Sequence, residues 1–264
     1  MCIVEPCEVA GITAAILARL LFFIAKIAKV RPSLFKRIFI MHTHKQEQKK
    51  PKNGTLKLFS NSRELENREK LKKMHVRAVF ARGIRGSDPI LFDKKPQIAF
   101  VGRSNVGKSS TINAILGDKI ARTSSTPGKT QEINFFEVEG KGYFVDLPGY
   151  GYAKMPEKEK EKIRKHILWY LASGEAKPKL LVLILDARVG VTAYDRDLIH
   201  VAHKEKHSLL LLLNKIDKLT KNERTKALGV LAQEFPDAEC ITFSATKKDN
   251  LSLVRARLFA LLGI

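Results

Sequence analysis

From residue 97 onward, short apolar runs alternate with longer stretches of helical composition, and this alternation constrains the fold more than any other feature. Each run is a nearly continuous block of aliphatic and aromatic residues bounded by turn residues, which is typical of strands covered on both faces. Alternating strands and helices predict an α/β fold, with a mostly parallel sheet wrapped by helices on both faces. The predicted strands are 98–101, 143–145, 180–185, 209–213 and 241–243, and the predicted helices are 108–116, 157–173, 193–206, 221–235 and 251–262.

One strand of this sheet is predicted to run antiparallel to the others. Residues 134–138 lead into the short segment 139–142, which contains two glycines, and the strand at 143–145 follows at once. A turn this short joins neighbouring antiparallel strands, because a parallel connection needs a long crossover. The sequence therefore predicts a six-stranded sheet with one antiparallel edge strand. A further short strand is expected at 76–80.

Residues 102–109 read GRSNVGKS and fit the pattern G-x-x-x-x-G-K-[ST], directly after one predicted strand and at the start of a predicted helix. The glycines let backbone N–H groups curl around phosphate oxygens, and a helix N-terminus favours negative charge. Lys108 supplies a positive charge to the β- and γ-phosphates, and the Ser109 hydroxyl can reach Mg²⁺. The segment therefore predicts a P-loop nucleotide site with magnesium as cofactor.

A second motif, Asp-Leu-Pro-Gly at 146–149, ends the strand at 143–145. The Asp146 carboxylate can hold Mg²⁺ through water, and the Gly149 N–H can sense a γ-phosphate. By itself this short motif is weak evidence for a nucleotide site, but it follows the phosphate loop in the order that a guanine-nucleotide switch requires.

Base selection is predicted at 214–217, Asn-Lys-Ile-Asp, which follows the apolar strand 209–213 and so faces the ligand crevice of the sheet. The Asp217 carboxylate can accept from guanine N1–H and the exocyclic amine, whereas adenine offers neither donor there. The next strand ends in Ser-Ala-Thr at 244–246, where a backbone N–H can donate to guanine O6. Together the motifs predict a GTP or GDP site.

Residues 97–264 resemble a translation-factor-related GTPase of the TrmE-Era-EngA-EngB-Septin-like class, and specifically the YihA/YsxC/EngB family of ribosome-biogenesis GTP-binding proteins. Three segments carry the resemblance: GRSNVGKSS at 102–110, TPGKTQ at 126–131 and DLPGYGYAK at 146–154. The last run is highly specific to the family. One departure is Asn214, where many relatives have threonine; it is closer to the general GTPase pattern and puts nothing in doubt.

The resemblance implies the remaining site residues. It makes Thr130 the switch threonine that coordinates Mg²⁺ and the γ-phosphate in the GTP state, although Thr126 is equally eligible from the residues alone. Catalytic roles are expected for Lys108, Thr130 and Gly149, and magnesium ligation for Ser109, Thr130 and, through water, Asp146. The expected nucleotide-binding residues are Gly102, Arg103, Ser104, Asn105, Val106, Gly107, Lys108, Ser109, Ser110, Gly128, Lys129, Thr130, Gln131, Glu132, Asp146, Leu147, Pro148, Gly149, Asn214, Lys215, Ile216, Asp217, Phe243, Ser244 and Ala245.

Tyr150 occupies the position where many GTPases carry the glutamine that orients the attacking water, so intrinsic hydrolysis is expected to be slow. We favour Tyr150 as an anchor of the switch packed on the core, with direct catalysis by its hydroxyl as the alternative. Potassium is a second cofactor to consider, because a side-chain carbonyl at Asn105 can help coordinate a monovalent cation beside the phosphates. The alternative is that Asn105 only braces the loop against the switch region.

The chain carries 48 basic and 27 acidic residues, and residues 1–96 hold 21 of the basic and 8 of the acidic ones. Such a surplus favours polyanionic partners, either nucleic acid or an anionic lipid surface. Two of the three cysteines, Cys2 and Cys7, lie at the N-terminus and Cys240 is far away, which favours a reducing, cytoplasmic setting over a disulfide framework.

The N-terminal part is predicted to be a basic extension, 1–73, ahead of a GTPase domain at 74–264. Charges interrupt its apolar stretch, so 9–37 is interpreted as an amphipathic segment and not as a membrane span, and a polar linker follows. The family usually begins close to the strand before the phosphate loop. The extension is therefore either a partner-docking helix or untranslated, with Met41 or Met74 as the start.

The resemblance implies a monomeric cytosolic GTPase that acts on ribosomal RNA or a preribosomal large subunit and is needed for normal septation in cell division. The sequence leaves a contrasting hypothesis open. In it, the chain is a nucleotide-gated scaffold at the division membrane, hydrolysis is incidental, and residues 9–37 bind an anionic membrane surface.

Overall fold

The computed structural model describes residues 69–71, 74–121, 132–153 and 155–264. The chain divides into two units, Met1–Phe59 and Ser60–Ile264, and all of the described residues belong to the second. The predictions made for segment 9–37, for the linker that follows it and for the switch residues 126–131 lie outside the described residues. Within the described part, no helix is both long and apolar enough to cross a lipid bilayer.

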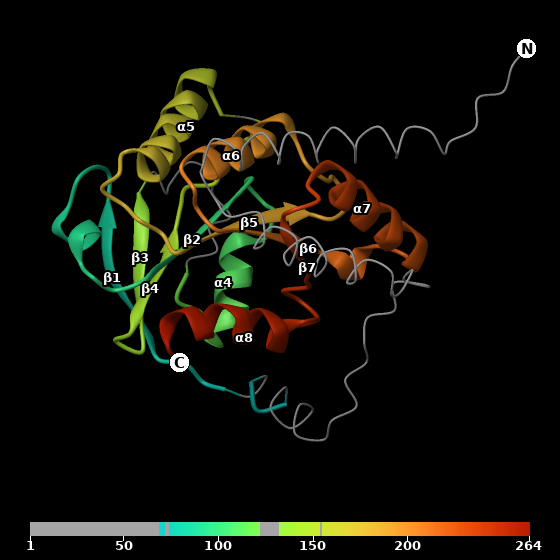
Figure 1. Cartoon of the computed structure of the whole chain (residues 1–264), viewed down its shortest axis with the longest axis horizontal. Helices are drawn as coiled ribbons and strands as arrows, with labels where there is room; N and C mark the ends of the chain where they lie inside the picture. The colour runs from blue at the N-terminus through green and yellow to red at the C-terminus, as the bar shows by residue number, and fades with distance from the viewer. Residues whose placement is uncertain (1–68, 72–73, 122–131, 154) are drawn as a thin grey trace, which may run out of the picture. The chain divides into compact units, whose positions relative to one another are not determined.

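The second unit is built on a seven-stranded sheet (Figure 1). Its strand order is β1-β3-β4-β2-β5-β6-β7. Neighbouring strands from β4 to β7 are parallel, and β3 runs antiparallel to both β4 and β1. The α/β class and the mostly parallel sheet are therefore confirmed. The strands are β1 (Ala78–Ile84), β2 (Gln97–Gly102), β3 (Ile133–Val138), β4 (Gly142–Asp146), β5 (Leu180–Asp186), β6 (Leu209–Asn214) and β7 (Glu239–Thr242).

Strand β1 corrects two details of the prediction. The sheet has seven strands and not six, and the antiparallel strand β3 is not at the edge, because β1 pairs along its outer side from Ala78↔Val138 to Ile84↔Ile133. Strand β1 also extends beyond the predicted 76–80, with a register shift between Phe80 and Arg82. Most of its side chains are exposed, as at many sheet edges.

Helices cover the sheet on both faces (Figure 1). Successive strand residues point to opposite faces, so Ile98 packs in the α4 and α8 layer while Ala99 packs in the other layer. Each predicted helix is confirmed to within two residues at its ends. The helices are α4 (Lys108–Leu116) and α8 (Leu251–Leu262) on one face, and α5 (Glu157–Ala172), α6 (Ala193–Lys204) and α7 (Lys221–Glu234) on the other; η1 (Pro89–Phe92) and η2 (Ile216–Lys218) are short 3₁₀ turns.

The topology brings the predicted motifs to one edge of the sheet. Strand β2 lies between β4 and β5, and all the parallel strands end at the same edge. The motifs at 102–109, 146–149 and 214–217 each follow the carboxyl end of a strand, where open α/β sheets form their ligand crevice.

Candidate functional site

The phosphate loop connects β2 directly to α4. Gly107 is the N-cap of α4 with φ 97°, and a Cβ there would lie 2.5 Å from Asn214 Nδ2. Glycine is the residue that adopts this left-handed conformation without steric cost, and the close approach of Asn214 leaves no room for a side chain. The first backbone N–H groups of α4 are therefore left facing the crevice, which is the arrangement that binds phosphate at a helix N-terminus.

Lys108 and Asp146 meet across this loop. Lys108 Nζ pairs with Asp146 Oδ1, and the two side chains are only 11% and 9% exposed. Asp146 is the last residue of β4, beside Phe100 of β2. The phosphate loop and the Asp146–Gly149 motif thus share one nearly buried ion pair.

This corner also fits a magnesium ion. Hard oxygen donors suit Mg²⁺, which usually keeps several waters and binds few protein ligands. The carboxylate of Asp146 and the hydroxyl of Ser109, the residue after Lys108 in α4, supply such donors. The third predicted ligand, Thr130, lies outside the described residues.

Asn214 connects the phosphate loop to the segment after β7. Its side chain is 2% exposed, Nδ2 donates to Val106 O at 2.9 Å, and Oδ1 accepts from the Ala245 N–H at 3.2 Å. Both ends of the amide are used, so Asn214 holds the base motif and the phosphate loop at a fixed separation.

Asp217 is presented as an ionised acceptor. Ser244 Oγ donates to Asp217 Oδ1 at 2.7 Å, and Ser244 Oγ in turn accepts from the Lys247 N–H at 2.9 Å. The Ser244 hydrogen bond lowers the pKa of Asp217 below its ordinary value despite partial burial. A carboxylate that stays charged and keeps free lone pairs is the acceptor that the guanine prediction requires.

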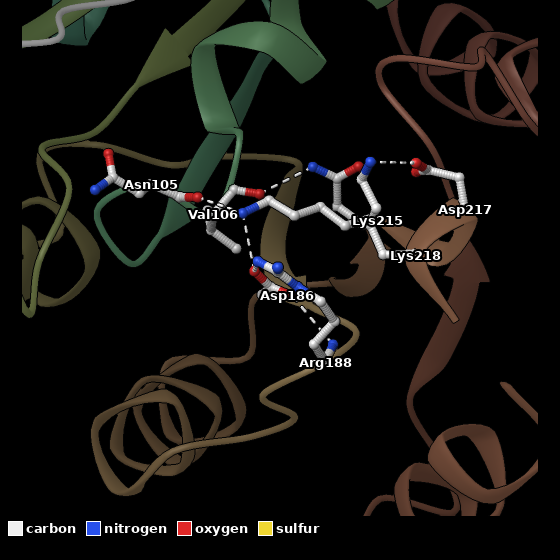
Figure 2. Close-up of polar contacts among 8 residues, drawn as sticks. Asn105, Val106, Asp186, Arg188, Lys215, Asp217 and Lys218 are labelled. Carbon is white, nitrogen blue, oxygen red and sulfur yellow. Dashed lines mark hydrogen bonds and ion pairs between the residues drawn. The ribbon is translucent and has the colours of Figure 1, made fainter. Parts of the chain in front are cut away.

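Lys215 links three segments, as Figure 2 shows. Its Nζ donates to Asn105 O at 2.6 Å and to Asp186 Oδ2 at 2.8 Å. Arg188 also binds Asp186, through Nε at 3.1 Å and Nη2 at 2.8 Å. Burial raises the pKa of Asp186, but the hydrogen bonds from Arg188 and Lys215 outweigh it and hold that pKa well below its usual range.

Asp186 was not predicted from the sequence. The signal that could have found it is an acidic residue at the carboxyl end of the apolar strand β5, since that end faces the crevice. A cavity of about 170 Å³ opens beside this residue. Its walls are formed by 103–106 of the phosphate loop, 184–186 and 188–190 around the end of β5, and by Asp195 and Lys215.

The Asn105 side chain points away from Lys215, while its backbone carbonyl faces the lysine (Figure 2). Asn105 has φ 65° and is exposed, and among the described residues its amide makes no hydrogen bond. The amide is therefore available to a ligand, and the potassium prediction stays untested.

Tyr150 behaves as the anchoring interpretation predicts. Its side chain is 3% exposed, and its hydroxyl donates to Asp195 in the layer between the sheet and α6. Burial and the Asp195 charge raise the pKa of this phenol well above its ordinary value, so it stays protonated. A hydroxyl committed to Asp195 does not orient water at the phosphates.

The predicted site residues that the structure describes lie at one edge of the sheet. The loop 102–110, the motif 146–149, the base motif 214–217 and residues 243–245 all lie at the carboxyl edge of the sheet. Glu132 precedes β3 and lies at this edge too, since Asn134 pairs with Asp146, and its carboxylate pairs with Arg85 at 3.2 Å. Residues 128–131 lie outside the described residues.

Comparisons with known proteins agree with this geometry. A family model described as "50S ribosome-binding GTPase" matches residues 97–215. A probable GTP-binding protein EngB of Mycoplasmopsis pulmonis is 40% identical over 164 residues, covering 62% of this chain and 88% of that protein. The protein of the same name from Mesomycoplasma hyopneumoniae is 44% identical over 163 residues, covering 62% and 81%. A crystal structure of a probable GTP-binding protein EngB aligns with a TM-score of 0.55 at 27% identity, over 63% of this chain and 98% of that one.

Proposed function

Because this chain belongs to the EngB family of GTP-binding proteins and is a GTPase, we propose that it is a nucleotide-dependent switch that assists assembly of the large ribosomal subunit. The observation that carries the proposal is the convergence of phosphate loop, Asp146–Gly149 motif and base motif at one sheet edge, tied together by Asn214. The description of the matching family as ribosome-binding supports the large ribosomal subunit as the partner.

In this proposal the chain's residues divide the work of binding GTP. Asp217 accepts from the guanine base, Lys108 exchanges its contact with Asp146 for the β- and γ-phosphates, and the Gly149 N–H senses the γ-phosphate. Magnesium, held by Ser109, Thr130 and, through water, Asp146, would neutralise charge on the phosphate oxygens when bound. Since Tyr150 replaces a water-orienting glutamine and is buried, intrinsic hydrolysis is slow and the switch stays on until its partner acts.

The charge of the chain supports a polyanionic partner, and we propose that the two meet in the cytoplasm. The formal net charge is +21, and ribosomal RNA presents a dense array of phosphates. We propose that the chain binds the precursor of the large subunit as a monomer in its GTP state, and that normal septation depends on this activity.

Sedimentation tests the proposal. The full chain is mixed with large-subunit precursors in the presence of GDP or of a non-hydrolysable GTP analogue. The variant Asp217→Asn, which is expected to bind guanine nucleotides weakly, is the control. We expect comigration with the particle only in the GTP analogue, declining steeply as salt rises. Equal comigration in GDP and in the GTP analogue would contradict the proposed nucleotide-dependent switch. Binding instead to anionic vesicles, lost when residues 9–37 are removed, would favour the membrane scaffold.

A further inference from the structure

The backbone of Tyr150 is fastened to the phosphate loop. The Ser104 N–H donates to Tyr150 O at 2.7 Å, and Arg103 and Tyr150 form an isolated parallel bridge. The preceding residue, Gly149, packs so closely on the same loop that a Cβ there would lie 3.3 Å from Ser104 Oγ and 3.5 Å from Ser104 Cα. Gly149 is therefore already held beside the loop that would cradle the phosphates.

The side chain of Tyr150 is fastened on the opposite side, to α6. Its hydroxyl donates to Asp195 Oδ1, and its ring packs edge-on against Tyr194 with centroids 4.5 Å apart. Asp195 is only 1% exposed. Its other oxygen, Oδ2, accepts from the Thr192 N–H at 2.7 Å and from Thr192 Oγ1 at 2.6 Å. The carboxylate that receives Tyr150 is thus itself held rigidly.

The two oxygens of Asp195 have separable tasks. Oδ2 binds Thr192 at the start of α6 and accounts for a helix-capping role by itself. Oδ1 is not needed for that role and is committed to Tyr150, 45 residues earlier in the chain. Burying a carboxylate destabilises the fold unless both oxygens accept hydrogen bonds. The hydrogen bond from Tyr150 therefore satisfies an oxygen that the helix cap leaves without a donor.

We infer that Asp195 is a positioning residue for recognition of the γ-phosphate. Asp195 holds Tyr150, and Tyr150 in turn holds Gly149 against the phosphate loop, so that the Gly149 N–H is in place when GTP arrives. GDP has no γ-phosphate and gains nothing from this contact. The inference rests on the proposed role of Gly149, and it assigns to Asp195 a selective effect on GTP over GDP.

Four variants of the full chain test it: Tyr150→Phe, Asp195→Asn, the double variant, and Tyr194→Phe as a matched control. Tyr194 undergoes the same chemical change in the adjacent ring, and its buried hydroxyl has no hydrogen-bond partner among the described residues. The dissociation constants of GDP and of a non-hydrolysable GTP analogue are measured for each by titration calorimetry.

We expect Tyr150→Phe and Asp195→Asn each to weaken the GTP analogue about tenfold, the effect of one hydrogen bond to a charged acceptor, and to leave GDP within about twofold. The double variant should be no weaker than either single variant, since both remove one shared contact. Tyr194→Phe should keep the GTP to GDP ratio of the parent.

Equal losses for both nucleotides, no loss for either, or additive losses in the double variant would overturn the inference. So would a Tyr194→Phe effect as large as that of Tyr150→Phe. If Asp195→Asn does not fold because α6 loses its cap, the Tyr150→Phe result tests the inference by itself. That variant leaves the contacts between Thr192 and Asp195 intact. If the unmodified protein fails to bind GTP, the proposed function is contradicted. If the unmodified protein binds GTP but the variants weaken GTP and GDP equally, only the role of Asp195 is contradicted.

Discussion

At the scale of single residues, the proposed base specificity depends on a carboxylate that the fold keeps ionised. The Asp217 side chain is 10% exposed, Oδ1 accepts from the Ser244 hydroxyl at 2.7 Å, and Oδ2 lies 3.7 Å from Lys218 Nζ. The Ser244 hydrogen bond lowers the pKa of Asp217, so the carboxylate stays charged through the ordinary titration range of aspartate. Its capacity to accept two donors from guanine is lost only as pH falls through this lowered pKa.

The variant Asp217→Asn should exchange guanine for xanthine as the preferred base. Loss of a charged hydrogen bond to guanine should cost about 1.5–3 kcal/mol of binding free energy for GTP, while XTP binding improves. Competition titrations with the two nucleotides measure the exchange. GTP affinity equal to that of the parent would contradict the assignment of 214–217 as the base motif.

A second prediction at this scale is that hydrolysis depends on potassium. The Asn105 amide is exposed beside the phosphate loop, and Tyr150, whose hydroxyl binds Asp195, supplies no group to the phosphates. Turnover is compared in KCl and NaCl at equal ionic strength, because general screening is the same in both salts. We expect several-fold faster turnover in KCl, and Asn105→Ala should remove that advantage while GDP binding is nearly retained.

Equal turnover of the unmodified protein in the two salts would contradict the ion mechanism. The group that stabilises developing charge would then come from the partner, as an arginine finger does in other GTPases. The same result would favour the alternative role for Asn105, that of bracing the loop.

At the scale of elements, the contact between α4 and α8 depends on one buried guanidinium. Arg255 of α8 is 2% exposed, and its Nε donates to Ile115 O, near the C-terminus of α4, at 2.7 Å. Its Nη1 donates to Leu71 O at 2.5 Å and to Met74 O at 2.9 Å. A cation beside the last carbonyls of a helix also complements the helix dipole.

We expect Arg255→Met to lower the free energy of unfolding by about 3 kcal/mol, since it leaves the carbonyls of Ile115, Leu71 and Met74 without this donor. The control Arg257→Met, two residues further along α8, removes a surface ion pair with Glu239 and should cost less than about 1 kcal/mol. Urea unfolding monitored by circular dichroism measures both. Equal losses would show that the buried contacts of Arg255 contribute no more than a surface pair.

At the scale of the whole molecule, the start of the folded unit can be tested by truncation. The predicted boundary at Met74 stays a prediction, but Arg255 binds carbonyls on both sides of it. Deletion of residues 1–59 retains both carbonyl acceptors, Leu71 O and Met74 O, whereas deletion of residues 1–74 removes both. We expect the longer deletion to be less stable by about 2 kcal/mol in urea unfolding, with GDP affinity equal in the two.

The same pair of deletions in the Arg255→Met background provides the control. If the acceptors at Leu71 and Met74 account for the difference, the two truncated chains should then unfold at the same urea concentration. A difference that persists in this background would mean that other contacts of 60–74 stabilise the unit.

The sequence by itself determined the layered α/β fold and the position of the site. Strand β5 is recognisable as buried because its continuous apolar run is a local property, and the phosphate loop is recognisable because the backbone geometry of Gly107 depends on a few adjacent residues. Once the strands are parallel, their carboxyl ends must share an edge, so the three motifs converge without further information.

Only the tertiary structure decided the partners of side chains that meet across the fold. The pairing of Tyr150 with Asp195, of Lys215 with Asp186 and of Arg255 with Ile115 joins residues far apart in the chain. Nothing local marks these residues, because a buried polar group takes whichever donor or acceptor the packing of neighbouring elements brings within reach. Strand β1 is a related case: the sequence favours a short strand at 76–80, but only its pairing with β3 makes it the seventh strand, because an edge strand is stabilised by its hydrogen-bonded partner.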